Sequence, residues 1–302
     1  MRVAVTGASG LIGRALVPAL RADGHEVLLL VRRTPRTADE HRWDPRHRRI
    51  DPALLADVDA VVNLAGTPIR PRPWTRAYKE SVLTSRVDAT TTVSEALAVA
   101  AAADPSRPRV LLSASAVGYY GDTAARPVTE KEPAGTDFLA QVCVRWEAAT
   151  APASDAGVRV ALLRTGLVLG RSALLIQVLG LLFRLGLGGR LGSGRQYWPW
   201  ISLADEVRAI RHLLTADVSG PVNLTGPAPV TNAEFTRELG RILRRPTVLP
   251  VPGFALSAAL GEFARSSILG GQQALPVRLQ ESGFSFTHSR LEPALRESLG
   301  RS

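Results

Sequence analysis

Short, unbroken apolar runs recur along the first half of the chain and alternate with segments in which apolar residues have helical spacing. The pattern predicts strands at Met1–Thr6, Glu26–Val31, Ala60–Leu64, Val110–Ser113 and Val158–Leu163, and helices at Leu11–Ala22, Ser81–Ala103 and Phe138–Ala151. Continuous apolar strands that alternate with helices are typical of a parallel sheet covered on both faces. We therefore predict an α/β fold with a Rossmann-type, doubly wound parallel sheet.

The pattern changes after about Gly170, where longer helical and irregular segments are rich in glycine and proline. No linker, repeat or low-complexity tract separates the two parts. We predict a nucleotide-binding Rossmann core over residues 1–170, to which later segments return. A smaller C-terminal, substrate-side lobe is expected over residues 171–302.

Composition and charge narrow the range of partners. The chain has a net charge of +10, but only Lys79 and Lys131 are lysines and the arginines are scattered, so we expect no nucleic-acid partner. The most apolar window, Ala173–Leu191, is interrupted by Gln177 and Arg184 and predicts a buried or pocket-lining helix rather than a membrane span. No membrane partner is expected.

Three further features favour a cytoplasmic protein without a metal. The chain opens directly on a predicted strand, which argues against a signal peptide. Its single cysteine, Cys143, excludes an internal disulfide and fits a reducing compartment. The five histidines show no metal-ligand spacing, so we assign no metal site.

A glycine-rich loop lies between the first predicted strand and helix. It reads Gly7-Ala8-Ser9-Gly10-Leu11-Ile12-Gly13. In a dinucleotide-binding loop, the glycines permit a tight turn, close approach of the diphosphate and close packing of the helix. The helix N-terminus supplies free N–H groups to the phosphates. The loop therefore predicts a dinucleotide cofactor.

The end of the second strand indicates which dinucleotide. An NAD site usually has an acidic residue about 20 residues beyond the glycines, which holds the ribose 2′-hydroxyl. This chain has Val31-Arg32-Arg33 there instead. Guanidinium groups suit a 2′-phosphate, so we expect NADP(H); the alternative is two solvated arginines in an arginine-rich protein.

Several longer segments carry a family resemblance. Asn63–Gly66, Ser113–Gly121 and Arg164–Gly170 are similar to segments of extended short-chain dehydrogenases, the sugar-nucleotide epimerase/dehydratase group. More specifically, the chain resembles the atypical "epimerase family" proteins with a C-terminal domain of unknown function, here residues 250–297. This resemblance is carried by Trp74–Arg86, Asp137–Glu147, Gly186–Ser202, Gly220–Phe235 and Pro250–Leu295.

The resemblance implies further cofactor contacts and leaves the oligomeric state open. It places Leu64, Ala65 and Gly66 near the adenine or diphosphate, and it brings Glu80 and Arg86 to the cofactor from the following helix. Val168 would approach the nicotinamide through its backbone. Relatives often dimerise through helices of the Rossmann half, so a homodimer is one option.

The usual catalytic pair of this superfamily is missing. Typical members carry Tyr-x-x-x-Lys, in which the lysine lowers the pKa of the tyrosine so that the phenol can transfer a proton. Alignment on Trp146-Glu147 puts Leu139 at the tyrosine position and Cys143 at the lysine position. Neither side chain can replace the residue that it aligns with.

Other residues could supply the chemistry. Ser115 stands where a hydroxyl that polarises a carbonyl is expected, and Tyr119 and Tyr120 are the nearest phenols. The tyrosines could instead be aromatic packing at the end of a strand. Cys143 could be a nucleophile, although a buried thiol that acts as a small apolar residue is the simpler interpretation.

The substrate side also departs from sugar-nucleotide enzymes. An arginine that clamps the diphosphate often precedes the Asp205 position by about seven residues in the related enzymes, and here that place is Trp198. The aromatic run Tyr197–Trp200 favours an apolar or aromatic small molecule, or else forms the core between the lobes. Arg190 and Arg195 lie close in sequence and could compensate.

Three functions remain. The first is an NADP(H)-dependent oxidoreductase that acts on a small carbonyl or alcohol compound. The second is a non-catalytic NADP(H)-binding protein that regulates a partner. The third, a sugar-nucleotide epimerase or dehydratase, is opposed by Leu139, Cys143 and Trp198.

Overall fold

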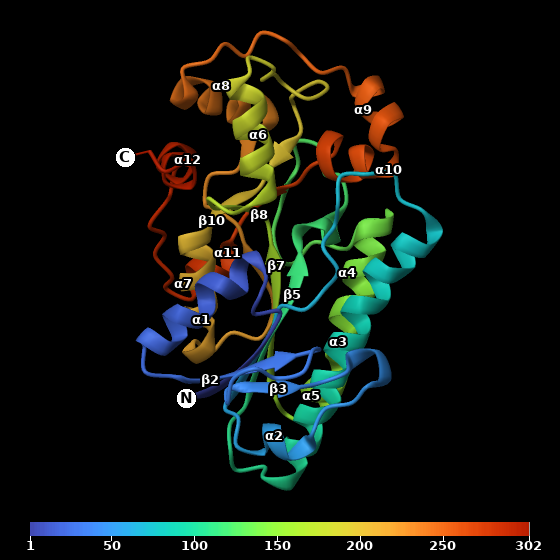
Figure 1. Ribbon diagram of the computed structural model, residues 1–302, viewed down its shortest axis with the longest axis vertical. Coiled ribbons are helices and arrows are strands. Elements are labelled where there is room, and N and C mark those ends of the chain that lie inside the picture. The colour runs from blue at the N-terminus through green and yellow to red at the C-terminus, as the bar shows by residue number, and fades with distance from the viewer. Residues whose placement is uncertain (302) are drawn as a thin grey trace.

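The computed structural model describes residues 1–301, and its centre is a seven-stranded sheet in which every neighbouring pair is parallel (Figure 1). The strand order is β11-β7-β5-β4-β1-β2-β3. The α/β, doubly wound prediction is confirmed. The strands are β1 (Arg2–Thr6), β2 (Glu26–Val31), β3 (Glu40–Arg42), β4 (Ala60–Asn63), β5 (Val110–Ala116), β7 (Arg159–Thr165) and β11 (Gly220–Leu224).

Helices cover both faces of the sheet. On one face, α1 (Leu11–Ala22) and α7 (Leu203–Thr215) contact each other and share a core with β1 and β4. On the other face lie α2 (Pro52–Ala56), α3 (Arg76–Ala103), α4 (Phe138–Ala148) and α5 (Ala151–Asp155) (Figure 1).

Two helices differ from the predicted bounds for local reasons. Helix α3 starts at Arg76 rather than Ser81, because the Thr75 hydroxyl accepts a hydrogen bond from the Tyr78 N–H and caps the helix there. The predicted helix Phe138–Ala151 ends at Ala148, and a second helix begins at Ala151 with a proline in its first turn.

The remaining segments build a lobe over the carboxyl end of the sheet (Figure 1). Its main core packs α6 (Leu174–Arg184), α8 (Asn232–Leu243) and α12 (Leu291–Leu299) around Trp198, Trp200 and Phe235. The other elements of the lobe are α9 (Gly253–Leu260), α10 (Glu262–Ala264) and the strand pairs β8 (Leu167–Leu169) with β10 (Trp200–Ser202), β9 (Tyr197–Trp198) with β12 (Val230–Thr231), and β6 (Pro127–Val128) with β13 (Gln273–Ala274). Helix α11 (Val277–Glu281) packs on β11 of the sheet instead.

Parts of the second half of the chain return to the first. Helix α7 packs on the sheet, and β11 forms its edge strand beside β7. Near the C-terminus, β13 pairs with β6, and the Gln272 side-chain amide donates a hydrogen bond to the Gly121 carbonyl (2.6 Å). Core and lobe are therefore interleaved.

Helix α6 lies on the surface, so the prediction of a buried or pocket-lining helix in Ala173–Leu191 is wrong. Only Ile176, Gly180 and Phe183 of this helix are buried, and they face the lobe core. The opposite face also carries apolar residues, and these are exposed. No helix within residues 1–301 is both long and apolar enough to cross a bilayer.

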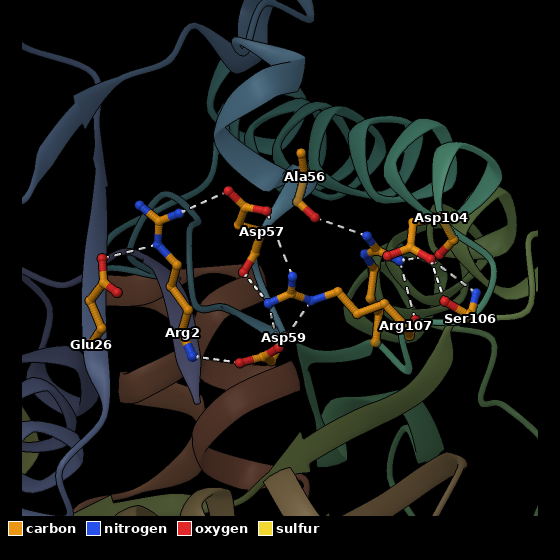
Figure 2. A network of polar contacts seen from close by, with 9 residues as sticks. Arg2, Glu26, Ala56, Asp57, Asp59, Asp104, Ser106 and Arg107 are labelled. Atoms are coloured by element: carbon orange, nitrogen blue, oxygen red, sulfur yellow. Dashed lines mark hydrogen bonds and ion pairs between the residues drawn. The ribbon is translucent and has the colours of Figure 1, made fainter.

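An ion-pair network ties together the amino ends of the strands (Figure 2). The carboxylate of Asp59, just before β4, accepts hydrogen bonds from the Arg2 N–H (2.7 Å) and from the Arg107 guanidinium (2.8 Å). Burial raises the pKa of Asp59, but these two donors outweigh it and hold the pKa below its ordinary value. Arg2 also pairs with Glu26 on β2 (3.0 Å), so the network spans neighbouring strands.

We expect Asp59→Asn to lower the free energy of unfolding by about 1 kcal/mol at pH 7, because a charged acceptor is lost. Since the folded pKa of Asp59 is lowered, this stability is present above the ordinary pKa and disappears as the pH falls through the folded value. Urea unfolding of both proteins between pH 7 and pH 3 measures the difference. Asp57→Asn is the matched control, because Asp57 is 70% exposed and its ion pairs are longer than 3.5 Å.

Candidate functional site: a dinucleotide cavity and its neighbouring side chains

In the glycine loop, neighbouring backbone atoms lie too close to Gly7 and Gly13 to leave room for a side chain, as the glycine pattern predicts. Gly7 has φ +67°, and a Cβ there would lie 2.6 Å from the Leu64 carbonyl oxygen. A Cβ on Gly13 would lie 2.5 Å from the Gly7 carbonyl oxygen. Helix α1 starts immediately after Gly10, and no side chain caps it, so its first N–H groups remain available to an anion.

A cavity of about 760 Å³ opens beside this loop at the carboxyl ends of β1, β2 and β4. It brings together most of the predicted cofactor residues, namely Gly7, Ser9, Gly10, Val31, Arg32, Arg33, Leu64, Ala65 and Gly66. Leu11, Ile12 and Gly13 lie in the first turn of α1, and Glu80 lines an adjoining cavity of about 680 Å³. Glu40, Trp43 and Pro45 also line the main cavity, although the sequence analysis did not identify them.

The two arginines after β2 have different surroundings. The Arg33 guanidinium donates two hydrogen bonds to the Glu40 carboxylate, one of them at 2.7 Å, and the hydrogen bond from Arg33 lowers the pKa of Glu40. Arg32 is exposed, lines both cavities and has no carboxylate within 4 Å among the described residues. Arg32 is therefore the guanidinium that is available to a phosphate.

A buried chain of hydrogen bonds holds the β4 side of the cavity. Thr6 donates to the Asn63 side chain (2.7 Å), and its hydroxyl accepts from the N–H groups of Leu64 (3.0 Å) and Ala65 (3.1 Å). Asn63 in turn donates to Thr90 on α3 (2.8 Å). The turn after β4 is thereby fixed against the glycine loop.

Arg86 of α3 is a buried cation behind this turn. It is 9% exposed, and its Nη1 donates to the carbonyl oxygens of Thr67 and Val82, both at 3.0 Å. Burial lowers the pKa of Arg86, and the nearby Cys143 and Tyr78 partly oppose this shift. Within residues 1–301, no carboxylate lies within 4 Å of its guanidinium.

Cys143 is buried on α4 near the end of β5, whereas Leu139, one turn earlier, is half-buried and lies beside Gly118. The Cys143 thiol is 3% exposed and lies 3.7 Å from the Ala116 carbonyl oxygen. Burial, together with the Glu147 charge, raises the pKa of Cys143 to about 12, so the thiol is protonated at neutral pH. This favours the interpretation of Cys143 as a small apolar residue. No group of three or more metal-binding side chains is found in the described part of the chain.

Ser115 is engaged in a buried ion-pair network. Its hydroxyl donates to Glu147 Oε1 (2.6 Å), and Arg164 Nε and Nη2 donate to the two Glu147 oxygens, both at 2.8 Å. The Arg164 and Glu147 side chains are 4% and 10% exposed. Because Ser115 has only one hydroxyl proton, it can polarise a substrate carbonyl only after turning away from Glu147.

The two tyrosines are not equivalent. The Tyr120 hydroxyl donates to the Asn223 side chain (2.7 Å) and accepts from Arg164 (3.1 Å), and burial raises its pKa to about 12. Tyr119 is half-buried, and its ring centroid lies 3.4 Å from the Arg164 guanidinium carbon. Tyr120 therefore behaves as packing at the strand end, and Tyr119 is the more accessible phenol.

Of the two interpretations of the aromatic run Tyr197–Trp200, the structure supports a core position for its tryptophans rather than a substrate surface. Trp198 is 4% exposed and packs edge-on against Phe235, with 5.1 Å between ring centroids. Trp200 is fully buried, and its indole N–H donates to the Ala228 carbonyl (3.0 Å). Trp198 enters the lobe core from β9, which pairs with β12, and Trp200 enters it from β10, which pairs with β8. Val168 lies on β8 opposite Ile201 of β10 and packs against the sheet core.

Arg164→Met should lower the free energy of unfolding by about 3 kcal/mol or more, because it leaves the Glu147 carboxylate buried without its cation. Chemical denaturation measures the loss. The double change Arg164→Met with Glu147→Leu should be less destabilised than the single one, and Arg126→Met, whose ion pair is exposed, should lose less than about 1 kcal/mol. Equal stability of Arg164→Met and the wild type would contradict the structural role of the pair.

The family models match nearly the whole chain. The model described as the NAD dependent epimerase/dehydratase family matches residues 3–225, and a domain of unknown function, DUF1731, matches residues 251–298. The epimerase family protein Mb2239 of Mycobacterium bovis is 52% identical over 97% of this chain and 96% of its own.

Solved structures agree with these matches. The crystal structure of human epimerase family protein SDR39U1 with NADPH has a TM-score of 0.87 and 34% identity over 99% of both chains. A nucleoside-diphosphate sugar epimerase from Corynebacterium glutamicum has a TM-score of 0.79 and 35% identity over 99% of this chain and 58% of that one. The resemblance that the motifs predict is confirmed: this chain belongs to the NAD dependent epimerase/dehydratase family, among the epimerase family proteins with a C-terminal DUF1731.

Proposed function

We propose that the protein binds NADP(H) in the cavity beside the glycine loop and is an oxidoreductase for a small carbonyl or alcohol compound. The observation that carries the proposal is the combination of the uncapped N-terminus of α1 with an exposed, unpaired Arg32 in one cavity. The human relative crystallised with NADPH supports the choice of cofactor.

Each part of the cavity suits one part of NADP(H). The free N–H groups of α1 suit the diphosphate, and Arg32 suits the 2′-phosphate as a bidentate donor. The neighbouring Arg33 is held by Glu40, since two hydrogen bonds join these side chains. When bound, the nicotinamide would supply or accept a hydride.

The proposed proton transfer uses the chain's own hydroxyl groups. Ser115 can turn from Glu147 toward a substrate oxygen, because Arg164 keeps the carboxylate paired through two hydrogen bonds. Of the two candidate tyrosines, Tyr120 donates its hydroxyl hydrogen bond to the buried Asn223, which leaves Tyr119 as the candidate phenol. In this proposal Ser115 polarises the carbonyl and Tyr119 exchanges the proton.

A second candidate function is an NADP(H)-dependent regulatory protein without catalysis. One observation favours it: the hydroxyl groups of Ser115 and Tyr120 donate hydrogen bonds to internal side chains, and Cys143 is a buried, protonated thiol. Such a protein would bind a partner differently in the presence of NADPH and of NADP⁺.

Arg32→Ala should weaken NADPH binding at least about tenfold in calorimetric titration, because a charge-assisted pair with the 2′-phosphate is lost. NADH binding should change little. Arg33→Ala is the matched control and should have a smaller effect, since Glu40 already occupies that guanidinium. Equal losses for NADH and NADPH, or no binding of any nucleotide by the wild type, would contradict the assignment.

Ser115→Ala should lower the rate of NADPH oxidation with a panel of aldehydes and ketones by about 100-fold. Ser106→Ala, in the loop before the amino end of β5, should leave the rate unchanged, because Ser106 contacts Asp104 and lies at the other end of the strand that carries Ser115. If the wild type binds NADPH tightly but oxidises none across the panel, the oxidoreductase proposal fails. The regulatory candidate would then be tested by partner binding with each redox form.

A further inference from the structure

The lobe carries an apolar surface that neither the cofactor cavity nor the lobe core uses. Nine of the twelve exposed large apolar side chains among residues 1–301 belong to two segments, 171–203 and 239–261. We call this set the lobe apolar face, and its members are Leu174, Val178, Leu181, Leu182, Leu185, Leu187, Val248, Leu249 and Phe254.

The members of the lobe apolar face are neighbours in space. Leu174, Val178, Leu181 and Leu185 recur at helical spacing along the outer side of α6. Backbone bridges join Gly189 to Val248 and Leu191 to Val251, and Phe254 follows two residues after Pro252 at the start of α9. Figure 1 shows α6 and α9 at the same end of the molecule.

The charged residues within the two segments all have one sign, and among residues 1–301 only Arg241 pairs with carboxylates outside them, those of Glu238 and Glu292. Segments 171–203 and 239–261 contain seven arginines and no aspartate or glutamate. Arg184, Arg190, Arg244 and Arg245 are exposed, and none has a carboxylate within 4 Å among the described residues. The Arg245 side chain donates to the Arg184 carbonyl (3.2 Å), so these arginines border the exposed leucines.

We propose that the lobe apolar face binds the surface of an anionic lipid bilayer. Exposed leucine, valine and phenylalanine side chains suit the boundary between headgroups and acyl chains, and the arginines suit lipid phosphates. The interrupted apolar window Ala173–Leu191 led us to expect no membrane partner, but contact along one face requires no spanning helix.

A second copy of this chain fits the face less well. In a symmetric dimer, the same patch meets itself. Such pairing would bring unpaired arginines of both copies together, with no carboxylate from segments 171–203 or 239–261 to neutralise them. Phosphate groups of a bilayer provide the complementary charge.

The test is co-sedimentation of the full-length chain with vesicles of phosphatidylcholine and with vesicles of equimolar phosphatidylcholine and phosphatidylglycerol. We expect at least about tenfold stronger binding to the anionic vesicles, weakened by salt. Leu181→Glu and Phe254→Glu should each reduce binding severalfold, because Leu181 is 57% and Phe254 79% exposed and neither supports the core. Unchanged unfolding temperatures establish that these variants are folded.

Val99→Glu is the matched control, since Val99 on α3 is also 57% exposed but lies outside the face. It should bind as the wild type does. No binding to anionic vesicles, equal binding to both compositions, or an equal loss in Val99→Glu would overturn the proposal. Sedimentation velocity measures self-association. If the wild type self-associates and Leu181→Glu does not, the face binds a second copy, and the bilayer proposal is overturned as well.

Discussion

The buried ion pair between Glu147 and Arg164 is the interaction on which the arrangement of this protein depends. It joins α4 to β7, and through Ser115 and Tyr120 it reaches β5 and the turn that follows it. Tyr120 continues to Asn223 on β11, so the same set of bonds reaches the last strand of the sheet. A buried pair of this kind gives little net stability, but removal of one partner alone strongly destabilises the fold. The position of the catalytic candidates is therefore set by a structural requirement.

This constraint explains why the nucleotide cavity and the catalytic candidates differ. In the cavity, the backbone of the glycine loop and the exposed Arg32 face open space, and a ligand can reach them without breaking an internal bond. Ser115 and Tyr120 do not line this cavity, and their hydroxyl groups already donate hydrogen bonds to the buried side chains of Glu147 and Asn223. Binding of a nucleotide thus costs the fold little, whereas chemistry at Ser115 requires a hydrogen bond to be exchanged. The two proposed functions differ in whether that exchange takes place.

Much of the Rossmann half can be predicted from sequence, because its signals are local. The bounds of α1 and β2 agree with the periodicity, and the glycine loop lies where a strand meets a helix. Contacts between residues that are far apart in the sequence could not be predicted. The pairing of Arg33 with Glu40 needs β3 to lie beside β2, and the burial of Trp198 needs β12 to lie beside β9. Apolar residues on both sides of α6 likewise do not reveal which side the lobe covers.

The pairing of β6 with β13 has a consequence for how the protein is made. The contacts between Gly121–Val128 and Gly271–Ala274 join residues about 150 positions apart. During synthesis, the segment after Tyr120 cannot make these contacts until residues 271–274 have been made. The described residues that line the nucleotide cavity all lie between Gly7 and Ala89, whereas the contacts around the catalytic candidates need residues that are made much later. A nascent or truncated chain would thus acquire its nucleotide cavity before the rest of its site.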